Sequence, residues 1–166
     1  MEINAIILKL IDFINPKRIF NWIIRKIYPL SKILQNIHIR LSSSSPLSFH
    51  LKGKDAMMCI RFEYINGVPV LLVREKIFIR TLSYGRSVIL TDHSFVDEAR
   101  INEGVSSETF YRVYLNNRQV EVIKAMFGED SRASVCIEGK AYFNTSFFGK
   151  IEKDFRLDNI SVEINI

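Results

Sequence analysis

Residues 55–65 read DAMMCIRFEYI, and their side chains alternate between apolar and polar along the run. The apolar set consists of Met58, Ile60, Phe62 and Tyr64, whereas the intervening set consists of Cys59, Arg61 and Glu63. A period of two places the apolar set on one face of a strand, against a core, and the other set on the opposite face. The run therefore predicts a half-buried β-strand.

The same period recurs through most of the chain after residue 36. Further strands are predicted at residues 37–41, 47–51, 68–79, 86–91, 109–115, 133–143, 151–157 and 160–166, with the alternation disturbed at 74–76. Turns are predicted at 66–67, 84–85 and 158–159, a polar loop at 92–107, and a short helix at 117–127. Many short strands with one helix, over about 125 residues, are typical of an antiparallel β-sandwich.

The N-terminal stretch, residues 1–40, reads MEINAIILKLIDFINPKRIFNWIIRKIYPLSKILQNIHIR and has a different pattern. The chain has 23 Lys and Arg against 18 Asp and Glu. Seven of the bases and two of the acids lie in residues 1–40, which leaves sixteen of each sign in residues 41–166. The net charge of +5 therefore belongs to the N-terminal stretch, which favours an anionic partner there; a solvated helix face is the alternative.

Apolar residues in this stretch recur with the period of an amphipathic helix. A first helix is predicted at residues 3–14, and a second begins at Pro16, after Asn15 as its N-cap, and ends at Tyr28-Pro29. The second helix groups Ile19, Phe20 and Ile23 on one face, while Lys17, Arg18 and Arg25 lie opposite. Trp22 and Lys26 lie at the border, where an indole and a long amine suit lipid headgroups. Such helices fit an in-plane membrane anchor or an arm that docks on a protein.

No uncharged apolar run approaches the roughly 18–20 residues that span a bilayer. The acidic start and the large apolar residues that follow also argue against a cleaved signal peptide. We therefore expect a cytoplasmic protein that is peripheral to a membrane or part of a complex.

The residues that usually carry chemistry do not form a recognisable catalytic or metal-binding pattern. His38, His50 and His93 lie on separate predicted elements, without metal-ligand spacing. Asp97 and Glu98 fall in the predicted polar loop, where solvated carboxylates are more common than cation ligands. We expect no enzyme activity and no cofactor, and the neutral β-region argues against a nucleic-acid partner.

Two further pairs of residues carry specific expectations. Cys59 and Cys136 share their strand faces with charged residues, so both are predicted to point outward from opposite sheets as free thiols in a reducing compartment. Phe147 and Phe148 are adjacent at a predicted hairpin tip, where neighbouring side chains face opposite ways. At most one of them is expected to enter the core. The other is expected to contact lipid, a partner or the N-terminal helices, with local packing as the alternative.

Residues 132–166, RASVCIEGKAYFNTSFFGKIEKDFRLDNISVEINI, resemble the end of the late embryogenesis abundant group 2 family, the water-stress and hypersensitive-response (WHy) domain. Gly139, Gly149 and Phe155 match the family's order of strand, glycine, hairpin and aromatic. Asn66 stands where the family has Asn-Pro-Asn, although Gly67 and Val68 follow it here. The resemblance covers residues 37–166 and implies an immunoglobulin-like or fibronectin-like sandwich. It also implies a non-enzymatic protein, often tethered to a membrane and associated with stress protection or lipid handling.

The sequence thus predicts an amphipathic basic segment, residues 1–36, followed by a WHy-like sandwich at 37–166. The predicted partner of residues 1–36 is an anionic membrane surface, with lipid as a candidate ligand. The alternative is a protein partner or copies of the chain itself, in a larger assembly. The predicted contact residues are Lys17, Arg18, Ile19, Phe20, Trp22, Ile23, Arg25, Lys26, Phe147 and Phe148.

Overall fold

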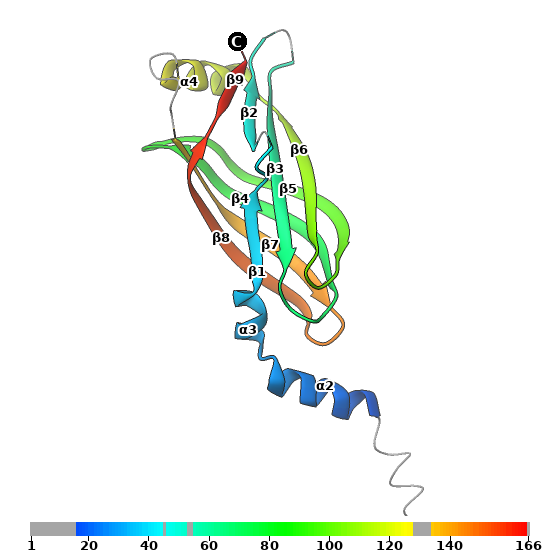
Figure 1. Ribbon diagram of the computed structural model, residues 1–166. Helices are drawn as coiled ribbons and strands as arrows, with labels where there is room; N and C mark the ends of the chain where they lie inside the picture. Colours follow the sequence, from blue (N-terminus) through cyan, green and yellow to red (C-terminus); the bar gives the residue numbers. More distant parts are fainter. Residues whose placement is uncertain (1–15, 45, 53–54, 128–133, 166) are drawn as a thin grey trace, which may run out of the picture.

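The computed structural model describes residues 16–44, 46–52, 55–127 and 134–165, which form two packed β-sheets preceded by helices (Figure 1). The five-stranded sheet contains β1 (Ile37–Leu41), β2 (Leu47–His50), β3 (Met57–Asn66), β6 (Ser106–Tyr114) and β9 (Glu163–Asn165). The four-stranded sheet has the order β5 (Ser87–Ile101), β4 (Leu72–Tyr84), β7 (Ser134–Thr145) and β8 (Gly149–Ser161). The helices are α2 (Pro16–Ile27), α3 (Leu30–Gln35) and α4 (Asn117–Phe127). The predicted mainly-β sandwich with one short internal helix is therefore confirmed.

Strand β3 lies at the centre of the five-stranded sheet. It pairs along its length with β6 on one side, and with β1 and then β2 on the other. Its predicted inward residues, Met58, Ile60, Phe62 and Tyr64, are fully buried between the sheets. The opposite sheet supplies Ile77, Ile79 and Phe143 to the same core. The inner face predicted from the period of two is therefore confirmed.

The predicted polar loop at residues 92–107 is wrong. These residues belong mostly to β5, a strand of 15 residues that pairs with β4. Two register shifts, at Arg74/Lys76 and Leu82/Ser83, interrupt its alternation, and Asp92 has a positive φ of 50°. An edge strand with bulges and a solvated face loses the simple alternation by which strands are recognised.

The end of the chain also differs from the prediction. Asp158 and Asn159 do not form a turn: they lie in a bulge of β8, where Asn159 has a φ of 56° and the register with β7 shifts. The chain then crosses to the other sheet, where β9 pairs with β2 in parallel. The predicted strand at 160–166 is thus divided between the two sheets over its described residues, and Ile166 lies outside them.

Helix α4 covers the predicted range 117–127, and Asn116 caps its first turn. The side chain of Asn116 accepts a hydrogen bond from the Gln119 amide, and the Gln119 side chain accepts one from the Asn116 amide, each at 2.9 Å. This reciprocal pair is a capping box. The helix buries Ile123 and lies at the end of the sandwich opposite α2 (Figure 1).

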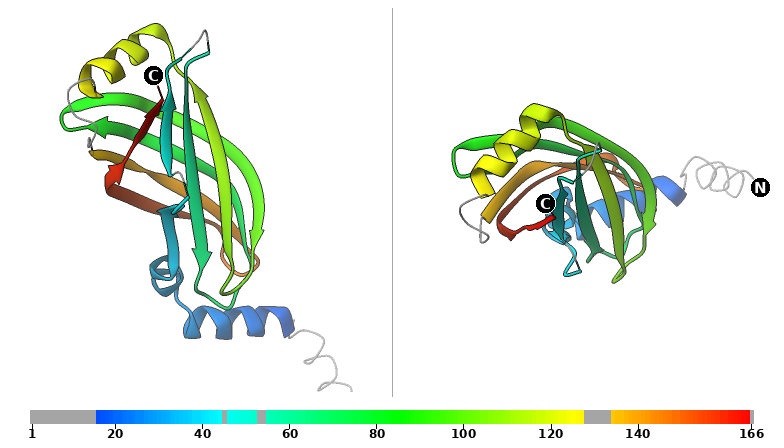
Figure 2. Two further views of the ribbon diagram at one scale, coloured as in Figure 1. Left: turned by 45° about the horizontal axis from the view of Figure 1, so that its top comes forward. Right: turned by 90° about the horizontal axis from the view of Figure 1, so that it is seen from above.

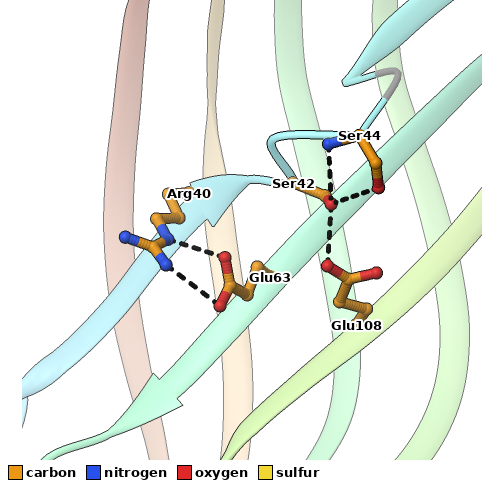
Figure 3. A network of polar contacts seen from close by, with 5 residues as sticks. All are labelled: Arg40, Ser42, Ser44, Glu63 and Glu108. Carbon is orange, nitrogen blue, oxygen red and sulfur yellow. Dashed lines mark hydrogen bonds and ion pairs between the residues drawn. The ribbon is translucent and has the colours of Figure 1, made fainter.

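A polar network holds the β1–β2 connection to the outer face of the five-stranded sheet (Figure 3). Arg40 makes two hydrogen bonds with the Glu63 carboxylate, at 2.7 and 3.1 Å. The buried hydroxyl of Ser42 donates to Glu108 at 2.7 Å and contacts Ser44 at 3.1 Å. The polar groups of this network are hydrogen-bonded to one another. We therefore assign the network a structural role, which is to hold the β1–β2 connection on the sheet.

Both cysteines are free thiols, on different sheets. Cys59 lies on the predicted outer face but is buried, because Ser48 and Arg112 are its neighbours on the two flanking strands. This burial raises the pKa of the Cys59 thiol. Burial, together with Asp158, raises the pKa of Cys136 to about 11. The predicted outward direction of both cysteines is confirmed. Cys59 is nevertheless buried, because neighbouring side chains on the outer face cover it.

Candidate functional site

Helix α2 begins and ends where the sequence predicts. Pro16 is its first residue, a position at which the missing amide hydrogen costs nothing. It ends at Ile27, before Pro29, and α3 follows after that proline. The helix predicted at residues 3–14 and its neighbour Asn15 lie outside the described residues.

Helix α3 fixes this region to the sandwich. Ile33 is fully buried in the core, and Lys153 of β8 donates to the carbonyl of Leu34 at 2.6 Å. The amide of Gly67 donates to the carbonyl of Asn36 at 2.9 Å, and a Cβ on Gly67 would approach that oxygen to 2.8 Å. The connection from α3 to β1 is thus packed against the β3–β4 loop.

Helix α2 contacts the turn between β7 and β8. The Arg25 side chain donates two hydrogen bonds to the carbonyl oxygen of Phe147, from Nε at 3.1 Å and Nη2 at 2.7 Å. The Arg25 guanidinium lies over the Phe148 ring, 5.6 Å from its centre. The rings of Phe20 and Phe147 are 5.9 Å apart. Both phenylalanines are partly buried against the core and both also contact α2, so local packing and contact with the N-terminal helix occur together.

Much of the surface of α2 remains exposed, and this exposed part is largely apolar. The exposed fractions are 44% for Ile19, 55% for Phe20, 57% for Trp22, 41% for Ile23 and 55% for Ile27, and Leu30 of α3 follows with 41%. We call these six residues the apolar face. Their exposure is unusual, because large apolar side chains that cluster on one surface mark an interaction site.

The charged side chains of α2 are all positive. Lys17, Arg18 and Lys26 are exposed, and the sequence of α2 contains no acidic residue. The ammonium of Lys26 lies 4.4 Å from the centre of the Trp22 ring, at the edge of the apolar face. Arg25 is hydrogen-bonded to the β7–β8 turn. All ten predicted contact residues therefore lie at one end of the molecule, on α2 or on the turn beside it.

A buried ion pair was not predicted from the sequence. Arg74 of β4 is 1% exposed, and its Nη2 lies 2.6 Å from Oδ2 of Asp97 on β5. The guanidinium stacks on the Tyr64 ring at 4.3 Å. Burial raises the pKa of the Tyr64 hydroxyl and that of Tyr111. The disturbed alternation at 74–76 was the available signal, since a bulge at that position directs both side chains to each other.

The other candidates from the sequence do not assemble. His38, His50 and His93 lie on β1, β2 and β5. In the described part of the chain, His, Cys, Asp and Glu side chains form no group of three or more that could hold a metal ion. Nor does any helix within that part have the length and apolar content that crossing a bilayer requires.

Among known proteins, only solved structures are similar to this chain, and the similarity is one of fold. No family model matches the sequence, and no curated protein matches it. The X-ray structure of a Northeast Structural Genomics Consortium target is 6% identical and has a TM-score of 0.50, covering 76% of this chain and 87% of that one. The solution structure of a candidate late embryogenesis abundant protein is 11% identical, with a TM-score of 0.45 and coverage of 96% and 87%. A protein from Archaeoglobus fulgidus is 10% identical, with a TM-score of 0.42 and coverage of 75% and 95%. At 6% identity, the similarity to the Northeast Structural Genomics Consortium target shows a shared fold and nothing further.

Proposed function

We propose that the protein is a non-catalytic β-sandwich that attaches to anionic membrane surfaces through α2. The supporting observation is the apolar face of α2, which lies exposed beside Lys17, Arg18 and Lys26 and has no acidic residue near it in the helix. A helix of this kind lies in the plane of the membrane interface, with its apolar side chains among the acyl chains and its bases at the headgroups.

The magnitudes favour a reversible attachment. Burying one Ile, Leu or Phe completely contributes about 1.5–3 kcal/mol, so each half-exposed side chain of the apolar face contributes on the order of 1 kcal/mol. Each Lys or Arg near an anionic surface adds about 1 kcal/mol at moderate salt. The apolar contribution thus exceeds the electrostatic one, and salt should weaken binding without abolishing it.

The protein itself carries a reporter for this attachment. Trp22 is the only tryptophan of the chain, and it lies on the apolar face. We expect its fluorescence to shift to shorter wavelength with anionic phosphatidylserine-containing vesicles, and much less with neutral phosphatidylcholine vesicles. Flotation of the full chain with the same vesicles gives an independent measure of binding.

Matched variants separate the apolar face from the rest of the surface. Ile23→Ser with Ile27→Ser should reduce flotation at least tenfold, because both side chains are exposed in the free protein and leave the core intact. Val88→Ser with Val96→Ser is the control, since these valines are also exposed but lie on β5. Arg18→Glu with Lys26→Glu should reduce binding to anionic vesicles only, and Arg86→Glu with Lys52→Glu is its control.

A protein that floats with neither kind of vesicle would refute the membrane proposal. In that case, the alternative is that the apolar face docks on a partner protein or on a second copy, as a structural subunit of a larger assembly. Sedimentation of the full chain would then show association that the Ile23→Ser, Ile27→Ser variant lacks.

A further inference from the structure

Three connections of the sandwich lie at the same end as α2. They are the β3–β4 loop (67–71), the β5–β6 turn (102–105) and the β7–β8 turn (146–148), which we call the loop end (Figures 1 and 2). Two exposed apolar side chains lie here, Leu71 with 40% and Val105 with 47% of their surface accessible. The opposite end carries α4 and the β4–β5 turn, where Gln119 donates to the carbonyl of Ile89 at 3.3 Å.

Asn66 joins two of the three connections of the loop end. Its side chain is fully buried and donates to the carbonyls of Val70 at 2.7 Å and Ile101 at 2.9 Å, while it accepts from the Val68 amide at 3.1 Å. Its backbone carbonyl accepts from the Gly104 amide at 2.8 Å. One residue therefore ties the β3–β4 loop to the β5–β6 turn.

Helix α2 lies across the loop end rather than along the side of the sandwich (Figure 2). The two hydrogen bonds from Arg25 to Phe147, and the stacking of Arg25 on Phe148, hold it there. Ile33 and Asn36 fix the segment that follows it. The direction of α2 is thereby set relative to the strands.

We propose that the contact between α2 and the β7–β8 turn fixes the orientation of the bound protein, so that the sandwich stands upright on an anionic bilayer with Leu71 and Val105 at the headgroup layer. This inference rests on the proposed function. A helix with its side chains is about 10–12 Å thick, and an interfacial helix is immersed by about 5–10 Å. An immersed α2 therefore brings the loop end to within about 7 Å of the headgroups.

The upright orientation places the two ends of the molecule at very different heights. Strand β4 has 13 residues and runs from the loop end to the β4–β5 turn. At about 3.3 Å per residue, it separates the two ends by about 40 Å. A side chain at Val88, beside the β4–β5 turn, would then be far from lipid, whereas one at Val105 would be close to it.

The single tryptophan allows a direct test. In a Trp22→Phe background, which keeps the apolar face apolar, Val105→Trp or Val88→Trp introduces one indole at an exposed site. Each variant is first shown to float with phosphatidylserine vesicles, and its fluorescence is then measured with a nitroxide-labelled headgroup lipid. We expect at least about fivefold stronger quenching at position 105 than at position 88. Equal quenching at both positions, or none at either, in variants that float would overturn the upright orientation while leaving the membrane attachment intact. Failure of the wild-type chain to float would instead refute the attachment.

The role of Arg25 is tested by Arg25→Lys in the same two reporter proteins. Lysine keeps the positive charge but has no planar group from which two nitrogens can donate to the same carbonyl oxygen. We expect flotation to remain within about twofold of the parent and the difference in quenching between positions 105 and 88 to fall by at least half. An unchanged difference would show that the contact with Phe147 does not set the orientation.

Discussion

The ring of Phe155 occupies the space beside Gly139, on the neighbouring strand, that a side chain would otherwise fill. A Cβ on Gly139 would approach Cζ of Phe155 to 2.8 Å, and it would also collide with the backbone carbonyl of Phe78. Phe155 packs edge-on against Phe62 across the core, with ring centres 5.7 Å apart. The glycine thus allows an aromatic side chain to bridge the two sheets.

Gly139→Ala should therefore destabilise the protein by about 3 kcal/mol, as overpacking against a backbone atom does. Urea unfolding followed by circular dichroism measures this change. Gly104→Ala is a matched control: Gly104 has a φ of 69° but no atom within 4 Å of its added Cβ. Its cost should be about 1 kcal/mol, from backbone strain alone. Equal losses in both variants would contradict the packing explanation.

Asn66→Asp should cost about 3 kcal/mol, because it replaces a buried donor that serves two carbonyls with a carboxylate that faces the same oxygens. Asn66→Ala should cost less, since it introduces no charge. Hydrogen exchange at the amides of Val68 and Gly104 measures the local effect. If these amides were as protected in the Asn66 variants as in the wild type, Asn66 would not organise the loop end.

Asp97→Ala should cost about 2 kcal/mol, because it leaves the buried guanidinium of Arg74 without its partner. The partly exposed position of Asp97 keeps the figure at the low end for a buried pair. Arg74→Met removes the charge and fills similar space, so it should be less harmful. In a double-mutant cycle by urea unfolding, the two changes should couple; additive losses would contradict a stabilising pair.

The hydrogen bonds from Arg40 hold the pKa of Glu63 below its usual range. A lowered carboxyl pKa contributes stability above the ordinary pKa, near 4.5, and this contribution disappears as the pH falls through the folded value. Glu63→Gln should therefore be less stable than the wild type at pH 7, by a small amount because Arg40 is exposed, and the difference should shrink towards pH 3. Urea midpoints at the two pH values measure it. Arg40→Met should show the same trend, and a difference that grows on acidification would refute the explanation.

Local patterns predicted the elements that have one face against the core and the other face towards solvent. The alternation of Met58, Ile60 and Phe62 predicted the inner face of β3, and the asparagine pair Asn116-Asn117 predicted the start of α4. The failures lie where two strands must adjust to each other. The bulge that directs Asp97 towards Arg74 breaks the alternation of β5. The bulge at Asn159 interrupts β8, and the chain crosses to the other sheet only after Ser161.

The sequence by itself determined the two-part organisation: a basic amphipathic helix from Pro16 to Ile27, followed by strands with one apolar face. These features depend on the spacing of neighbouring residues, which helical and extended geometry convert directly into faces. Only the tertiary structure decided which side of α2 stays exposed and that Arg25 hydrogen-bonds to the β7–β8 turn. Arg25 and Phe147 are 122 residues apart, and their contact depends on how both sheets close around the core, which no local pattern encodes.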